Sequence, residues 1–193
     1  MTDLNALTAL GAAQPRLASF AALDIRENPE LALASLALRR GATKPAPFGL
    51  ELPKPGRWVA GHGVAAFWVG PDQWMIEAEG RAEENFAVEL KEASSDCTVT
   101  EQTDGWIVFE IVSRSGAAPV EALLSKLVNI DLAGFGPGRA TRTGLDDMSC
   151  FVIRRSKTHV AVVGARSFVG SLWHALETAA QRVRENTMSF SNL

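Results

Sequence analysis

The alternation of hydrophobic and polar positions predicts several β-strands in the first half of the chain. Leucine alternates with smaller residues over residues 31–38, which fits a strand, although the alanine content leaves a helix as the alternative. Residues 64–69 and 73–77 flank Gly70-Pro71-Asp72, a sequence typical of a tight turn, and together predict a hairpin. Residues 98–102 alternate as well and predict a further strand.

Helical spacing predicts two helices in the middle of the chain. Residues 83–93 combine spaced apolar side chains with good helix formers, which indicates an amphipathic helix. Residues 117–127 predict a second helix, with Pro119 in the first turn, where its missing N–H costs little.

A second series of strands and a last helix fill the C-terminal part. Residues 106–112, 148–154 and 159–163 predict strands. The last helix is expected from Ser167, a suitable N-cap, to about Arg184. Four apolar residues of this helix fall on one stripe, which predicts that they face the core: Phe168, Leu172, Trp173 and Leu176.

Three segments lack a regular pattern. Residues 1–29 are weakly patterned and broken by prolines, so we expect an extended N-terminal arm. Residues 44–56 contain four prolines and have room for one short helical turn. Residues 186–193 predict a polar, frayed tail.

The order of these elements predicts an α+β fold. Residues 30–185 form a single domain of two ferredoxin-like halves in tandem, about 30–103 and 104–185, between the arm and the tail. The pattern lacks the regular alternation of strands and helices that is typical of a doubly wound parallel sheet.

Composition narrows the classes of function. The 193 residues are 47% hydrophobic, enough for a sizeable core, and carry a net charge of −3, which argues against a nucleic-acid partner. No apolar run is long enough to span a membrane, and the N-terminus does not resemble a secretory signal. Two cysteines, Cys97 and Cys150, fit buried thiols in the cytoplasm better than a disulfide framework or a zinc site.

The residues that could carry chemistry do not form a coherent catalytic set. The segment from Gly134 to Arg139 resembles a phosphate-binding loop, but it lacks the lysine and Ser/Thr of a P-loop and no helix follows it. Asp146 and Asp147 fit a solvated turn, because neighbours on a strand face opposite ways. Three histidines show no metal-binding spacing: His62, His159 and His174.

Five tryptophans and no tyrosine suggest that some aromatic side chains contact a partner, since exposed tryptophans often anchor interfaces. We expect some of the tryptophans to lie in the core and consider an interface role for at least one of Trp68, Trp74 and Trp173. The candidates for partner contact are Asp72, Trp74 and Arg166.

Three sequence blocks resemble the gamma subunit of heterotetrameric sarcosine oxidase. They span residues 67–76, 102–108 and 164–176, and their order and spacing fit that family over roughly residues 20–182. Residues 31–41 and 48–53 fit more loosely.

The resemblance implies the fold of the folate-binding aminomethyltransferase domain of the glycine cleavage system. It also implies a complex that oxidatively demethylates sarcosine to glycine, makes hydrogen peroxide and passes the one-carbon unit to tetrahydrofolate. In that family FAD, FMN and NAD belong mainly to the alpha and beta subunits and zinc to delta, so the gamma subunit is implied to hold no cofactor and no catalytic group.

Two departures from the folate-using relatives agree with such a role. The stretch nearest to their pterin-binding Gly-Tyr-Thr-Gly-Glu segment, residues 142–147, lacks both the tyrosine and the glutamate. The counterpart of the Lys-Gly-Cys segment, residues 126–131, has no cysteine. A standalone folate-binding or aminomethyltransferase-like protein is the alternative, and a nucleotide binder that uses Arg139 is a third hypothesis.

Overall fold

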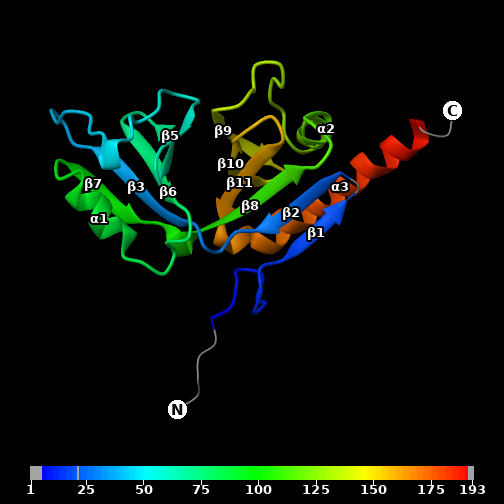
Figure 1. Ribbon diagram of the computed structural model, residues 1–193, viewed down its shortest axis with the longest axis horizontal. Helices are drawn as coiled ribbons and strands as arrows, with labels where there is room; N and C mark the ends of the chain where they lie inside the picture. The colour runs from blue at the N-terminus through cyan, green and yellow to red at the C-terminus, as the bar shows by residue number, and fades with distance from the viewer. Residues whose placement is uncertain (1–5, 21, 191–193) are drawn as a thin grey trace, which may run out of the picture.

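The computed structural model describes the backbone of residues 6–20 and 22–190 and the side chains of residues 6–20 and 22–183. Two antiparallel sheets diverge from a shared junction, with helices on their outer faces (Figure 1). The α+β class expected from the sequence is confirmed. Within the described residues, no helix is both long and apolar enough to cross a membrane.

The five-stranded sheet is built from the middle of the chain. Its order is β4 (Trp58–Ala60), β5 (Ala65–Gly70), β6 (Gln73–Ala78), β3 (Ala32–Leu38) and β7 (Cys97–Glu101). Helix α1 (Phe86–Glu92) packs on β3 and β7 and buries Phe86 and Leu90 completely. Residues 32–38 form β3, so the strand predicted for this segment is confirmed over all but its first residue, and the alternative helix is wrong. The proline-rich segment holds one turn, η1 (Pro47–Gly49), as expected.

The six-stranded sheet combines strands from both ends of the chain. Its order is β1 (Leu17–Phe20), β2 (Leu23–Glu27), β8 (Trp106–Ser113), β11 (His159–Ala165), β10 (Met148–Arg154) and β9 (Arg139–Leu145). Helices α2 (Ala118–Leu127) and α3 (Val169–Phe190) cover its outer face. The short turns η2 (Thr103–Gly105) and η3 (Arg166–Phe168) precede β8 and α3.

The expected N-terminal arm is wrong for residues 17–20 and 23–27. They form strands β1 and β2, which pair with each other, and β2 also pairs with β8 from Leu23↔Ser113 to Glu27↔Phe109. This pair of strands is held by buried Leu23 and Ile25, each 1% exposed, and its alternation is short enough to be missed in a weakly patterned segment. Residues 1–5 and 21 of the predicted arm lie outside the described residues.

The last helix differs from its prediction at both ends. It begins at Val169, and Ser167 lies in η3 without capping the helix. Leu172, Trp173 and Leu176 are buried, but Phe168 is 46% exposed because it precedes the first turn of the helix. The helix continues to Phe190, so the tail was wrong for residues 186–190, and residues 191–193 lie outside the described range.

A third core joins the inner faces of the two sheets. Phe67 and Met75 of the five-stranded sheet meet Val108, Phe151 and Ile153 of the six-stranded sheet. The rings of Phe67 and Phe151 lie 5.1 Å apart in a tilted arrangement. This apolar contact fixes the angle between the sheets and leaves a hollow beside it, where β1 and β2 extend beyond the five-stranded sheet.

Candidate functional site

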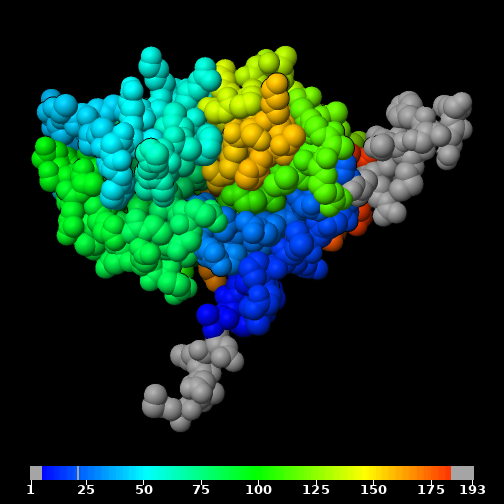
Figure 2. Space-filling view, in the orientation of Figure 1, coloured from blue at the N-terminus to red at the C-terminus, as the bar shows by residue number. Residues whose placement is uncertain are grey.

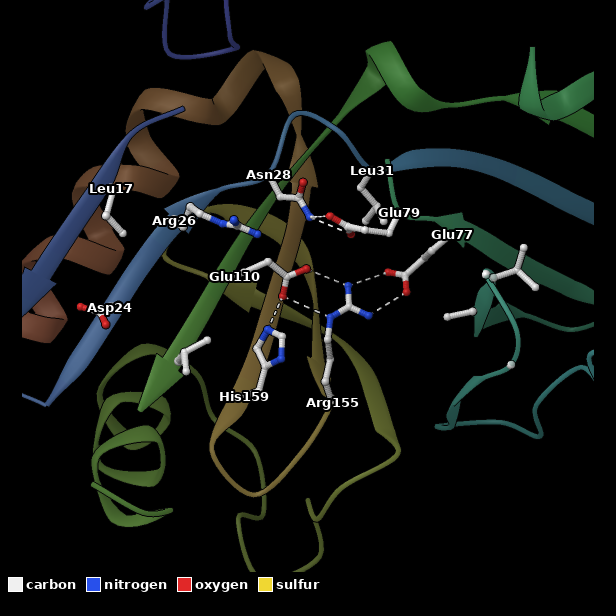
Figure 3. Close-up of a pocket in the computed structure, with 15 residues that line it drawn as sticks. Leu17, Asp24, Arg26, Asn28, Leu31, Glu77, Glu79, Glu110, Arg155 and His159 are labelled. Carbon is white, nitrogen blue, oxygen red and sulfur yellow. Dashed lines mark hydrogen bonds and ion pairs between the residues drawn. The ribbon is translucent and has the colours of Figure 1, made fainter. Parts of the chain in front are cut away.

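A cavity of about 590 Å³ opens where the two sheets diverge (Figure 3). One wall comes from β1, β2 and β8, and the opposite wall from β6 and the segment 61–65 that leads into β5. Charged side chains converge on it from both sheets. Volume and position are those expected of a small-molecule or peptide site, so this cavity is the candidate functional site.

Arg155 lies between two buried carboxylates that come from different sheets. It donates to Glu77 of β6 from Nη1 (2.8 Å) and Nη2 (3.2 Å). It also donates to Glu110 of β8 from Nε (3.1 Å) and Nη2 (3.0 Å). The Arg155, Glu77 and Glu110 side chains are 11%, 2% and 8% exposed. One guanidinium thus makes two bidentate pairs and ties the two sheets together.

Trp58 and His159 complete this cluster, here called the Arg155 network: Trp58, Glu77, Glu110, Arg155 and His159. The indole Nε1 of Trp58 donates to Glu77 Oε2 at 2.9 Å, and its ring lies 5.3 Å from the Arg155 guanidinium carbon. The His159 Nε2 lies 2.7 Å from Glu110 Oε2. The network therefore places each carboxylate against a cation and a second polar group.

The turn between β10 and β11 places Arg155 and His159 on the same carboxylate. The backbone N–H of Arg155 donates to the His159 carbonyl at 3.0 Å, which closes the turn. His159 begins β11 opposite Val112 of β8, close to Glu110 on the same strand. A tight turn between two central strands thus brings two basic side chains to one position of β8.

Burial and charge act in opposite directions on this network. Burial alone raises the pKa of Glu110, but the hydrogen bond from His159 and the charge of Arg155 outweigh it, so the pKa lies below its ordinary value. Burial alone lowers the pKa of Arg155, and the charges of Glu77 and Glu110 raise it above its ordinary value. Glu110 is therefore an anion and Arg155 a cation at neutral pH.

The rim of the cavity carries further charges. Asp24 pairs with Arg114, and Glu79 accepts two hydrogen bonds from the Asn28 amide at 3.1 and 3.2 Å. Arg26 points into the cavity from β2 and makes no ion pair within the part of the chain that the structure describes. Apolar Leu17 and Val112, 63% and 39% exposed, lie beside it.

The polar side chains of this cavity are largely engaged with one another. Its carboxylates accept hydrogen bonds from neighbouring side chains. No serine, cysteine, threonine or lysine is among the described residues that line the cavity. The Arg155 network thereby holds the two sheets together.

The predicted contact residues Asp72, Trp74 and Arg166 are not brought together in this cavity. Asp72 is exposed in the β5–β6 turn, where its φ is 55° and its carbonyl accepts from the Leu38 N–H at 2.9 Å. Arg166 is exposed in η3, 3.9 Å from Asp104, and lines a second cavity of about 730 Å³. Partner contact through Asp72 and Arg166 stays a prediction.

Trp74 needs a correction, because its side chain is only 4% exposed. Its Nε1 donates to the Pro53 carbonyl at 2.8 Å, and the Lys44 ammonium lies 5.2 Å from its ring centre. These contacts fasten the proline-rich connection to the sheet. In this fold Trp74 has almost no surface for a partner to touch.

Other candidate residues have local structural roles. His62 and His174 are exposed and separate from the Arg155 network, while His159 belongs to it. Asp146 and Asp147 are exposed in the turn between β9 and β10.

Cys97 and Cys150 are free thiols, and burial raises the pKa of Cys150 to about 11. Within the described residues, no group of acidic, histidine or cysteine side chains could hold a metal ion.

The glycine-rich segment is a connection between α2 and β9. The N–H groups of Phe135, Gly138 and Arg139 donate to the carbonyls of Leu132, Arg154 and Gly136, and Pro137 has no N–H. These three donors are engaged within the protein and are therefore not available to a phosphate.

Sequence reasoning missed Glu77, Glu110 and Arg155. The first two were visible as single acidic residues inside otherwise apolar strands, Trp74-Met-Ile-Glu77 and Phe109-Glu-Ile111. A buried acid in such a strand requires a partner, which makes it a signal for an inter-sheet pair. No pattern in one sequence shows that Arg155 supplies that partner.

The fold matches that of two solved proteins. A chain of the heterotetrameric sarcosine oxidase from Corynebacterium sp. U-96, solved with pyrrole 2-carboxylate, superposes with a TM-score of 0.72 at 23% identity, covering 87% of this chain and 88% of that one. The glycine cleavage system aminomethyltransferase T from Bartonella henselae gives 0.58 at 13% identity over 86% of this chain. This chain spans about half (51%) of that aminomethyltransferase.

The chain therefore has an aminomethyltransferase-like fold, as the sequence resemblance implied. A chain of a heterotetrameric sarcosine oxidase has the same fold at nearly the same length. No protein-family model and no curated protein matches the sequence.

Proposed function

We propose that this chain is a non-catalytic small subunit, of the gamma type, in a cytoplasmic heterotetrameric sarcosine oxidase. Such a complex oxidatively demethylates sarcosine to glycine and transfers the one-carbon unit to tetrahydrofolate. The chain would help to assemble the complex, with alpha, beta and delta subunits as partners. FAD, FMN, NAD and tetrahydrofolate would be bound by the other subunits.

One observation carries this proposal: the fold match extends over 87% of this chain and 88% of the sarcosine oxidase chain. Because both chains are covered almost equally, the matched chain is about as long as this one. A domain of a much larger subunit would be covered only in part, as the aminomethyltransferase is at 51%. The near-equal lengths favour a small subunit over either large one.

The Arg155 network supports a structural role for the chain. Its charges hold the two sheets together, and no serine, cysteine, threonine or lysine is among the described residues that line the nearby cavity. The sequence blocks at residues 67–76 and 164–176 that resemble the gamma family lie on the β5–β6 hairpin and at the β11–α3 junction. They maintain the fold through buried residues such as Trp74 and Trp173.

Co-expression tests the proposal. The alpha, beta and delta subunits are produced with and without this chain, and complexes are separated by size-exclusion chromatography and assayed for flavin content and sarcosine-dependent hydrogen peroxide production. We expect the chain to co-elute with the flavin-containing subunits and to be required for their full yield. A complex that assembles and turns over sarcosine equally well without this chain would refute the proposal.

A standalone folate-binding protein is the second candidate function, favoured by the aminomethyltransferase-like fold and the open cavity of about 590 Å³. Arg155 lines this cavity and lies 5.3 Å from the Trp58 ring, so tryptophan fluorescence is a suitable probe of an occupant. Titration of the purified chain with a reduced folate separates the two candidates. Saturable quenching at micromolar ligand would favour folate binding, and unchanged fluorescence at millimolar ligand would exclude it.

A further inference from the structure

Two arginines from distant parts of the sequence meet where the edges of the two sheets approach each other. Arg57 directly precedes β4, and Arg139 begins β9. They face each other in an isolated antiparallel bridge. Figure 2 shows the segment before β4, in cyan, against the start of β9, in yellow, on the upper side of the molecule.

The backbone pattern brings the two side chains close together. The Trp58 N–H donates to the Gly138 carbonyl at 2.9 Å, and the Ala140 N–H donates to the Gly56 carbonyl at 3.2 Å. The hydrogen bonds therefore flank the bridge, and Arg57 and Arg139 are its non-hydrogen-bonded pair. In such a pair the Cα atoms are about 4.5 Å apart and the side chains leave on the same face.

This pair of like charges is not neutralised within the described part of the chain. Neither guanidinium makes an ion pair with a described carboxylate, and Arg139 Nε donates instead to the uncharged Gly134 carbonyl at 3.1 Å. Like charges directly opposite each other on paired strands are destabilising. The isolated chain thus carries an unfavourable contact although its net charge is −3 and acidic residues outnumber basic ones.

Other arginines of the described chain pair with carboxylates. Arg81 and Arg155 each pair with two glutamates, and Arg154 pairs with one. Arg57 and Arg139 instead face each other, and Arg139 lines a hollow of about 420 Å³ together with Asp131, with which it makes no ion pair. An anionic group of a partner would neutralise this pair of cations.

The chemistry of the pair identifies the anion. The neighbouring glycine loop uses the N–H groups of Phe135, Gly138 and Arg139 internally, so these three donors are not available to a phosphate. The two arginine side chains on one face of the bridge remain, and the planar fork of arginine matches a carboxylate in a bidentate pair. A protein partner supplies such carboxylates as aspartate or glutamate side chains.

We propose that Arg57 and Arg139 form a docking point for an acidic side chain of a partner subunit. This inference rests on the proposed function, because the partner is another subunit of the same complex. The contact neutralises a pair of charges that the isolated chain leaves in repulsion, so assembly gains from relief of that repulsion as well as from the new ion pairs.

Charge reversal in the whole complex tests the docking point. Arg57→Glu with Arg139→Glu is co-expressed with the alpha, beta and delta subunits, and affinity is measured by titrating the tagged chain against the remaining subunits. The matched control is Arg39→Glu with Arg40→Glu, two exposed arginines in the connection after β3. We expect the double reversal to weaken binding by at least about tenfold, which corresponds to about 1.4 kcal/mol, and the control to bind like the wild type.

A second variant separates docking from folding. Arg57→Gln removes one charge without introducing a new one, so the isolated chain should melt at the wild-type temperature or slightly above it, while its binding to the complex weakens. Lower stability together with unchanged binding would show that Arg57 is purely structural and overturn the inference.

The failures of the two proposals can be told apart. If the wild-type chain joins the complex and the double reversal binds equally well, the docking point is wrong and the proposed function stands. If the wild-type chain does not join the complex at all, the proposed function is wrong and the docking point falls with it.

Discussion

Replacing Arg155 with methionine would leave two buried carboxylates without their shared cation. Glu77 would keep only the Trp58 N–H, and Glu110 would keep His159. Methionine has a similar length and packs well in irregular spaces, so the loss of charge, not of volume, dominates the change. The side chains of Glu77 and Glu110 are 2% and 8% exposed, so water does not readily replace the guanidinium.

The expected cost follows from this burial. Removal of one partner from a buried ion pair lowers the free energy of unfolding by about 3–5 kcal/mol. In a chain of this size, each kcal/mol shifts the melting temperature by about 2–4 °C. Arg155→Met should therefore lower the melting temperature by at least about 6 °C.

Thermal and urea denaturation, followed by circular dichroism, measure this loss. Arg81→Met is the matched control, because Arg81 makes its ion pairs with glutamates that are about half exposed. Surface pairs of this kind contribute about 0–1 kcal/mol. The double variant Glu77→Gln with Arg155→Met tests the cause, since a neutral amide still accepts from Trp58 but leaves no stranded charge at that position.

We expect the double variant to recover part of the stability that Arg155→Met loses. The reasoning is refuted if Arg155→Met costs no more than Arg81→Met, or if Glu77→Gln adds its own full cost in the double variant. Either result would mean that the apolar contact between the sheets, and not the Arg155 network, sets their cohesion.

Three further predictions concern packing and pH. Gly164→Ala should cost about 1–3 kcal/mol of unfolding free energy, because an added Cβ would lie 2.3 Å from Leu172 Cδ1, whereas Gly170→Ala, with open space around it, should be neutral or stabilising in the same denaturation assay. Leu172→Ala should lower the free energy of unfolding by about 2–5 kcal/mol and Phe168→Ser by less than about 0.5 kcal/mol. Thermal melts measure both losses, and equal losses would show that Phe168 is a core residue. The folded pKa of Glu110 lies below its ordinary value of 4.5, so this carboxylate contributes stability above that pH and the contribution is lost as the pH falls toward the folded pKa. The difference in unfolding free energy between the wild type and Glu110→Gln should therefore be largest near neutrality and shrink below about pH 4.5. A difference that grows in acid would contradict this prediction.

Strong periodic patterns were sufficient for most of the fold. The strands around Trp74 and Phe109 were predicted because they are buried on both faces, which leaves short, nearly continuous apolar runs in the sequence. The helix with Leu123 was predicted because it buries one face, which leaves a helical repeat. The hairpin β1–β2 was missed because it is two short strands, and its pairing with β8 depends on a distant segment. Phe168 was misassigned because helical spacing does not show where the first helical turn begins.

The candidate site was less predictable than the fold. Glu77, Glu110 and Arg155 come from three separate elements, and only the crossing of two sheets places them within hydrogen-bond distance. The sequence can show that an acid lies in an apolar strand, but the identity of its partner depends on tertiary geometry. The like-charge pair of Arg57 and Arg139 is hidden for the same reason, since a bridge between sheet edges has no local pattern.

The β1–β2 hairpin also determines the order in which the protein can become complete. In the sequence, β1 and β2 of the six-stranded sheet come before the strands of the five-stranded sheet, and β8 comes after them. Strand β2 therefore gains its second neighbour, with Asp24 opposite Val112, only after β8 has been made. During synthesis, β2 therefore emerges from the ribosome long before β8, and the backbone donors and acceptors on the edge of β2 that will face β8 stay unpaired in the interval. The two sheets consequently cannot mature as independent, successive units. The six-stranded sheet is completed only after the strands of the five-stranded sheet have been made, although β1 and β2 precede all of them in the sequence.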